Sequence, residues 1–147
     1  MGLGDLITLV AILACALFAG AAVYINLVEH PARLACGTEI AARQWAPSYK
    51  RATVLQAPLA LVAAAAGAAR WLQTGDGVWL GGALAIGAVV PVTFLVIFPT
   101  NKRLLDPGRD RASSETRALL ERWGHLHGIR SVLSLLGSVL FIWAATH

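Results

Sequence analysis

The sequence predicts an all-α membrane protein in which residues 1–147 form a single domain, a bundle of four transmembrane helices. The first sign is composition, because 57% of the residues are apolar and 14% are charged. Soluble domains average about 45–50% apolar and about 25% charged residues. The second sign is four long apolar stretches, since a helix needs about 20 residues to cross the hydrocarbon core of a bilayer. These stretches cover residues 6–28, 52–69, 78–98 and 126–145.

Each apolar stretch has recognisable ends. The first carries no charge, and it is too long and too poor in preceding basic residues for a secretory signal peptide. Pro31 is expected to end the first helix, because the residue before a proline is pushed out of the α region. Residues 73–77 (QTGDG) predict a tight turn between the second and third helices. Pro58 and Pro91 are expected to bend the second and third helices.

Basic residues are concentrated in two long loops, 29–51 and 99–122. These loops hold ten of the twelve Lys and Arg residues, while the opposite side has Arg70 alone and Arg130 lies at the start of the fourth helix. The positive-inside rule therefore predicts that both loops are cytoplasmic and both termini lie outside. The expected location is a bacterial inner membrane.

The loops are expected to contain short helices that lie along the membrane interface. One covers residues 113–123, with Ser113 or Ser114 as its N-cap, and the other covers residues 41–49. The loops also carry acidic residues and lack interleaved aromatic and basic residues, so the basic charge predicts topology and not nucleic-acid binding. The expected partners are the lipid bilayer and a lipophilic aromatic small molecule, and a homo-oligomer is left open.

Polar and aromatic residues gather at the cytoplasmic ends of the four predicted helices. Helical spacing places them on shared faces: Asn26, Glu29 and His30; Trp45, Tyr49, Thr53 and Gln56; Thr93 and Asn101; and Trp123, His127 and Arg130. A charge at the centre of a bilayer costs roughly 2.5–3.5 kcal/mol on insertion scales. We therefore expect Arg130 to pair with Glu29. Such residues have a structural interpretation, an ion pair within an interfacial belt, and a functional one, a polar pocket.

Four motifs in order along the chain resemble a known family. They are N-x-x-E-H-P (residues 26–31), W-x-P-S-Y-x-[KR] (45–51), P-V-T with P-T-N (91–93 and 99–101), and W-x-x-x-H-x-x-R (123–130). This set resembles the anthrone-oxygenase-like family of small integral membrane proteins, also called the DUF1772 family. Its characterised members look like fungal enzymes that convert an anthrone to an anthraquinone with O2. The resemblance implies the same helical fold and an oxygenase acting on a lipophilic phenolic, anthrone-like or quinol-like molecule.

The pocket residues suggest roles in such a reaction. His127 or His30 would be the base that takes a proton, with Glu29 orienting an imidazole. Arg130 and Asn101 would stabilise the phenolate that forms. The remaining residues would bind the substrate, the large aromatic ones by stacking on its rings: Asn26, Trp45, Tyr49, Thr93, Trp123 and Tyr24.

Other functions remain open from the sequence. No cofactor is obligatory, but His30, His127 and Glu29 form the ligand set of a non-haem iron or copper site, and the two histidines would also suit a haem. A non-enzymatic protein that binds or transports a small lipophile is a further alternative, as is a structural partner of another membrane protein.

Overall fold

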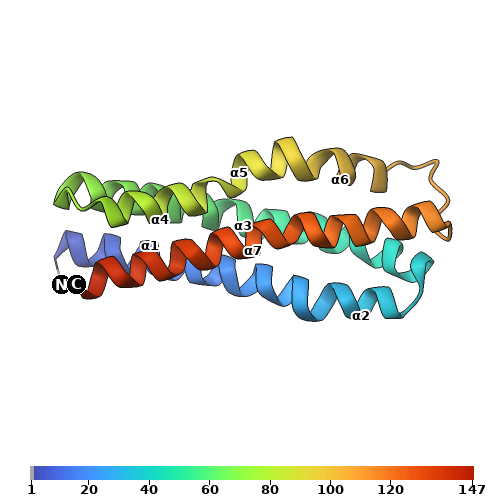
Figure 1. The fold of residues 1–147 in the computed structure, drawn as a ribbon, viewed down its shortest axis with the longest axis horizontal. Coiled ribbons are helices and arrows are strands. Elements are labelled where there is room, and N and C mark those ends of the chain that lie inside the picture. The colour runs from blue at the N-terminus through green and yellow to red at the C-terminus, as the bar shows by residue number, and fades with distance from the viewer. Residues whose placement is uncertain (1) are drawn as a thin grey trace.

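Four long helical segments run along the molecule and place the N- and C-termini at the same end (Figure 1). The computed structural model describes residues 2–147. The segments are, in order, α1 (Leu3–Tyr24) with η1 (Ile25–Glu29) and α2 (His30–Ala35); α3 (Thr38–Thr74); α4 (Gly77–Gly87) with α5 (Val89–Pro91), η2 (Val92–Ile97) and α6 (Phe98–Leu104); and α7 (Ser114–Thr146).

The four segments confirm the predicted transmembrane bundle. Within residues 2–147, four helices are long and apolar enough to cross a membrane, with mean hydropathies of 2.6, 1.7, 2.3 and 1.7. Each contains one of the four apolar stretches. α1 packs against α3 and α7, and α4 packs against the same two helices from the opposite side. These features indicate an integral membrane protein.

The polar regions between the spans are largely helical, and the two short helices expected there are parts of longer helices and not separate ones. Residues 41–49 belong to α3, and residues 114–122 belong to α7. The first link is the short turn at Cys36–Gly37, where Gly37 has a φ of 93° that favours glycine. The second link covers residues 105–113 and ends at Ser113, whose hydroxyl accepts from the Thr116 amide at 3.2 Å, as expected of an N-cap. An apolar run shows which part of a helix can lie in lipid. The helix itself continues beyond that run as long as its backbone hydrogen bonds form.

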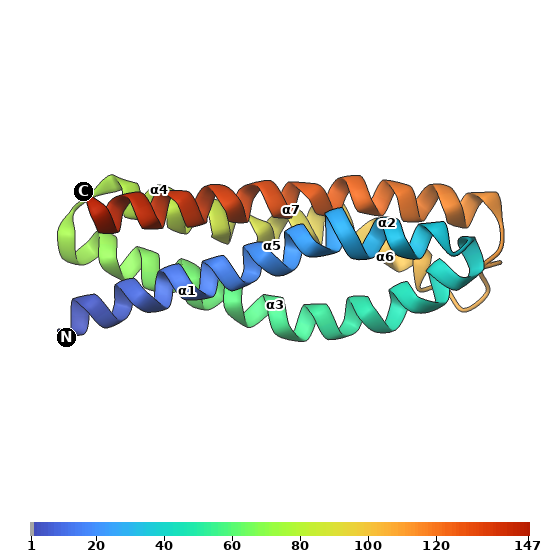
Figure 2. The same cartoon turned by 90° about the horizontal axis from the view of Figure 1, so that it is seen from below.

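Pro31 does not end the first helical segment, and this expectation was wrong. The π-helix η1 precedes it, so the backbone widens by one residue just before the proline. A proline inside an α-helix clashes with the carbonyl four residues earlier, and a wider turn relieves that clash. The same arrangement recurs where η2 precedes Pro99. α3 contains Pro47 and Pro58 and curves along its length (Figure 2).

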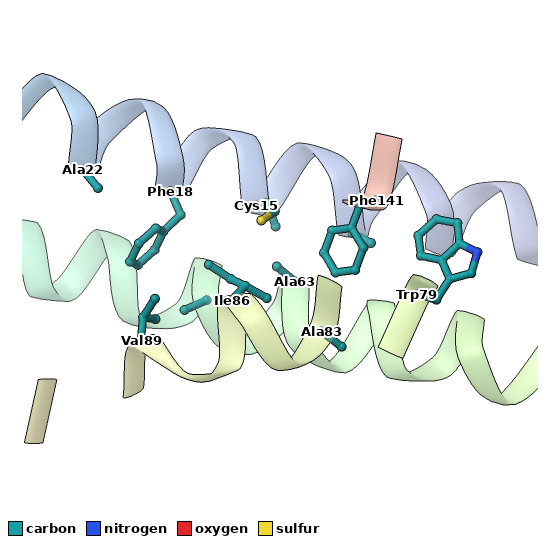
Figure 3. Close-up of a cluster of buried hydrophobic side chains, with 12 residues drawn as sticks. Cys15, Phe18, Ala22, Ala63, Trp79, Ala83, Ile86, Val89 and Phe141 are labelled. Carbon is teal, nitrogen blue, oxygen red and sulfur yellow. The ribbon is translucent and has the colours of Figure 1, made fainter. Parts of the chain in front are cut away.

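An apolar core fills the half of the bundle that carries the termini (Figure 3). Phe18, Trp79 and Phe141 are buried in it together with small side chains from three helices. Phe141 is tightly enclosed, because a Cβ atom added at Gly67 or Gly82 would lie 2.5 Å from its ring. The buried polar side chains next to this core include Ser134 and Ser138, whose hydroxyls donate to carbonyls of their own helix. Larger buried polar side chains lie further toward the Cys36–Gly37 turn.

Candidate functional site

His127 on α7 is held by Asn26 of η1 across the first and fourth segments. Its Nδ1 lies 2.7 Å from Asn26 Oδ1, and the Asn26 Nδ2 donates to the Gly124 carbonyl at 2.8 Å. The carbonyl can only accept, which fixes the orientation of the amide and makes His127 Nδ1 the donor. The Ser131 hydroxyl donates to the same Asn26 oxygen at 2.7 Å. His127 is 1% exposed, and its Nε2 keeps a free lone pair within the described residues.

His30 lies beside this cluster but makes a different bond. Its Nε2 donates to the Leu120 carbonyl at 2.9 Å. Its ring fits against Gly124, where a Cβ atom would approach the His30 Cδ2 to 2.7 Å. The rings of His30 and His127 both pack on the Trp123 indole, with centroids 5.0 and 4.8 Å away. The two histidines, which the sequence places in one polar pocket, therefore share contact with one aromatic ring.

Arg130 does not pair with Glu29, which corrects the expected ion pair. Its guanidinium donates to Gln56 Oε1 at 2.8 Å and lies 5.2 Å above the ring of Phe18. Arg130 is only 8% exposed, and no carboxylate of the described residues lies within 4 Å of it. Its Nε has no hydrogen-bond partner in the part of the chain that the structure describes. The site thus holds a buried cation without an anion.

Glu29 belongs instead to a network with Arg33 one turn further along. Arg33 forms an ion pair with Glu29, and the Ser48 hydroxyl and the Gln44 amide donate to the same carboxylate at 2.8 and 3.0 Å. The backbone continues as a helix past Pro31, so Glu29 and Arg33 are four residues apart on one face. This network connects the first segment to α3. It also binds the Glu29 carboxylate that was expected to form an ion pair with Arg130.

The expected metal-ligand set does not come together in this arrangement. Glu29 is committed to Arg33, Ser48 and Gln44, while His30 and His127 point ring nitrogens at protein oxygens. Among residues 2–147, no group of three His, Cys, Asp or Glu side chains is placed to hold a metal ion. These residues therefore do not fit the proposed His30, His127 and Glu29 site.

Three of the expected aromatic residues line the site and one does not. Trp45 and Tyr49 stack with their centroids 5.1 Å apart, and Trp45 meets Trp123 edge-on at 5.7 Å. Trp45 is buried and so lies in the bundle, not in an interfacial belt. Tyr24 is 56% exposed on the outer surface, away from these rings. The sequence could not separate the inner from the outer face of the first helix, because both are apolar.

Asn101 and Thr93 come from the third segment and have different surroundings. Asn101 is fully buried, and neither its Oδ1 nor its Nδ2 has a partner within the described residues. The Thr93 hydroxyl donates to the Val89 carbonyl at 2.6 Å, within its own helix. Buried amides normally form hydrogen bonds, so the lack of partners at Asn101 is unusual.

Two cavities meet at Arg130. The first is small, about 10 Å³, and polar; its walls include Tyr49, Gln56, His127 and Arg130. The second is about 220 Å³ and mainly apolar, between α3 and the α5–η2 region. Thr53 and Arg130 line both. The buried guanidinium therefore stands between the histidine and an apolar space of ligand size.

Sequence reasoning did not single out two residues that build the site. Ser131 shares Asn26 with His127, and Arg33 forms an ion pair with Glu29. A signal existed for both, since Ser131 is four residues from His127 and Arg33 is four residues from Glu29. Gln56 was expected on the polar face of the second helix, but not as the partner of Arg130. Gln56 could be paired with Arg130 only once α3 and α7 were placed together.

The fold and the site define a class: a four-helix integral membrane protein in which His127 and Arg130 are buried close together on one helix and Arg130 lines an apolar cavity. The chain belongs to the anthrone oxygenase family, whose family model matches residues 45–140. The matched range includes Trp45, Asn101, His127 and Arg130, while Asn26, Glu29 and His30 precede it.

Curated relatives are similar over part of their length. "Anthrone oxygenase" of Claviceps purpurea is 31% identical over 110 residues, covering 66% of this chain and 63% of the relative. Two proteins of Aspergillus fumigatus also match. "Anthrone oxygenase tpcL" is 45% identical over 36% of this chain and 35% of its own length. "Anthrone oxygenase encC" is 34% identical over 44% of this chain and 45% of its own length. The matches thus span less than two thirds of each relative, and no solved structure matches the chain significantly.

Proposed function

We propose that this protein is an oxygenase that deprotonates a lipophilic phenolic or anthrone-like molecule so that it reacts with O2. The observation that carries the proposal is Arg130 at the inner end of an apolar cavity, with His127 beside it in the wall of the small polar cavity that Arg130 also lines. His127 Nδ1 is fixed by Asn26, which leaves Nε2 as the base, and Arg130 is a buried cation without a carboxylate. Membership of the anthrone oxygenase family supports the same chemistry.

The reaction proposed for an anthrone is balanced by O2 alone. His127 Nε2 takes a proton from the methylene carbon, and the negative charge is delocalised onto the carbonyl oxygen of the anthrone, which lies beside Arg130. The carbanion passes its electrons to O2 and forms a carbon–oxygen bond, and the protonated His127 returns the proton to give a hydroperoxide. Loss of the second C–H proton with cleavage of the O–O bond yields the quinone carbonyl and one water. The substrate is oxidised and O2 is reduced.

Arg130 contributes most to this step through electrostatics. A fixed cation in a water-poor site stabilises developing negative charge far more than it would in water. The cation is already in place before substrate binds, because Gln56 and Phe18 hold the guanidinium. A general base adds about 10²–10⁴-fold to a rate, which is the share assigned to His127. No metal or haem is required, because the deprotonated substrate is itself the reductant of O2.

The test is oxygen uptake with a hydroxyanthrone, using protein in lipid nanodiscs and subtracting the rate without protein. His127→Gln is expected to lower kcat by about 10²-fold or more, as loss of a general base does. His125→Gln is the matched control, since His125 is exposed two residues away and makes no hydrogen bond in the Asn26 network. Equal loss in both variants, or wild-type activity in His127→Gln, would refute the assignment. Saturable binding with no uptake by the wild type would favour a lipophile-binding protein.

The proposal includes an orientation in which the polar half of the site is near the cytoplasm of a bacterial inner membrane. The concentration of basic residues at that end supports it. The chain provides its own probe, because Cys36 is exposed at the first link and Cys15 is buried. A membrane-impermeant maleimide should label Cys36 in inside-out vesicles and not in intact cells. The opposite pattern would reverse the orientation without affecting the chemistry.

A further inference from the structure

The apolar cavity of about 220 Å³ lies between α3 and the α5–η2 region. Ala57, Ala60 and Leu61 line it from α3, and Val89 and Phe94 line it from the third segment. The third segment leaves the line of α4 at this level, as Figure 1 shows around α5. Pro91 and the π-helix η2 interrupt the regular helix there, and both are recognised causes of a kink.

The mouth of this cavity is lined by side chains on the outer surface of the bundle. Leu61 is 59% exposed and Phe94 is 64% exposed, and Ala57 is exposed as well. All three belong to helices long and apolar enough to cross a membrane. A bundle placed in a bilayer would therefore open this cavity to hydrocarbon and not to water.

The inner end of the cavity has the opposite character. Arg130 closes it with a guanidinium whose Nε lacks a partner within the described residues. The acceptor that this guanidinium does contact, Gln56 Oε1 at 2.8 Å, is neutral. Burial of an unpaired charge is costly, and an oxygen that carries negative charge would remove the cost. The cavity thus has an apolar body and one positively charged end.

We propose that this cavity is the binding site of a compact planar hydroxyaromatic molecule that arrives from the bilayer, with its acidic oxygen against Arg130. The volume is below the ~300–1,000 Å³ of sites for drug-sized ligands, which favours a flat, fused-ring ligand over a bulky one. The apolar body suits the rings, and the guanidinium suits an ionised hydroxyl. The inference deepens the proposed function and rests on it for the reaction, but ligand binding can be measured separately.

The test uses a probe that O2 does not consume. 1,8-Dihydroxyanthraquinone is already oxidised, and its visible band moves to longer wavelength when a hydroxyl ionises. Titration into nanodiscs should give saturable binding with a red-shifted band at a pH where the free dye is neutral. Arg130→Gln should bind with at least tenfold lower affinity and without the red shift.

Two matched alanines on α3 distinguish this cavity from other parts of the surface. Ala57→Phe places a ring in the cavity, whereas Ala65→Phe places the same ring on an exposed position outside its lining. Ala57→Phe should weaken dye binding at least tenfold, and Ala65→Phe should stay within twofold of the wild type. Leu61→Trp, which narrows the mouth, is the second variant should Ala57→Phe fail to fold.

The outcomes separate the binding site from the proposed function. No saturable dye binding by the wild type, or equal affinity in Ala57→Phe and Ala65→Phe, would overturn the site even with oxygen uptake intact. Dye binding that follows the expected pattern, with no oxygen uptake from a hydroxyanthrone, would overturn the oxygenase and keep the site. Displacement of the dye by an acyl lipid but not by a hydroxyaromatic competitor would assign the cavity to lipid and overturn the proposal.

Discussion

Replacing Asn26 by leucine tests the centre of the site most directly. Leucine has nearly the same size, so the change removes hydrogen bonds with little change in volume. Three bonds between the first segment and α7 are lost: those to Gly124, to His127 and to Ser131. His127 then loses the acceptor that fixes its Nδ1 proton and its ring orientation.

The magnitude follows from those three bonds. Hydrogen bonds between membrane helices are worth about 0.6 kcal/mol on average and about 1.7 kcal/mol at most. Asn26→Leu should therefore lower the free energy of unfolding by about 2 kcal/mol, with ~5 kcal/mol as the upper bound on the same scale. Ser131→Ala breaks only one of the three bonds and should cost about a third as much. Oxygen uptake should fall at least tenfold in Asn26→Leu, because the base is no longer oriented.

Unfolding in mixed detergent micelles, followed by helical circular dichroism as the denaturing detergent is raised, measures the stability. Oxygen uptake with a hydroxyanthrone measures the second effect. Wild-type stability in Asn26→Leu would refute the hydrogen-bond network. Reduced stability with unchanged kcat would keep the network but remove Asn26 from the positioning of His127.

Three further changes test the packing around the site, each by the same unfolding titration. Gly124→Ala should cost about 1–3 kcal/mol, the usual range for overpacking, because its Cβ atom would lie 2.7 Å from the His30 ring. Glu29→Gln should cost about 1–3 kcal/mol, less than a fully buried pair, since Arg33 loses its counter-charge while 25% of the Glu29 side chain is exposed. Phe141→Ala should cost about 3–5 kcal/mol as a fully buried aromatic.

Leu27→Ala is the control for these three variants. Leu27 is 73% exposed on the surface of the bundle, so its truncation should leave the unfolding midpoint close to that of the wild type. A midpoint shift in Leu27→Ala as large as in Phe141→Ala would mean that the titration reports detergent binding and not packing.

The sequence was sufficient to predict the four-helix bundle, because the length and hydropathy of each apolar stretch are local properties. Length and hydropathy decide whether a helix can cross a membrane, and neither depends on the other helices. The turn at 73–77 and the N-cap at Ser113 were also predicted, since Gly75 takes a φ of 72° and Ser113 accepts from the next turn. These are short-range effects of backbone conformation.

The helix ends were beyond sequence reasoning. Residues 32–35 follow Pro31 and were expected to be a loop, and residues 41–49 were expected to be a separate interfacial helix, yet both belong to the long helical segments. Glu29, Arg33 and Ser48 form the network that connects these segments, and such tertiary contacts override local preference. The π-helix before Pro31 likewise has no simple sequence signature.

The sequence by itself determined that most of these polar residues gather at one end of the bundle, and the tertiary structure decided how they pair. Spacing placed His127 and Arg130 on one helix and Asn26 and His30 on another, and the structure brings these two helix faces together. Whether Arg130 meets Glu29 or Gln56 depends on how α7 is rotated against α3 and the first segment. Rotation is set by side-chain packing around Trp45 and Trp123, which is a sum over many weak contacts that no local pattern encodes.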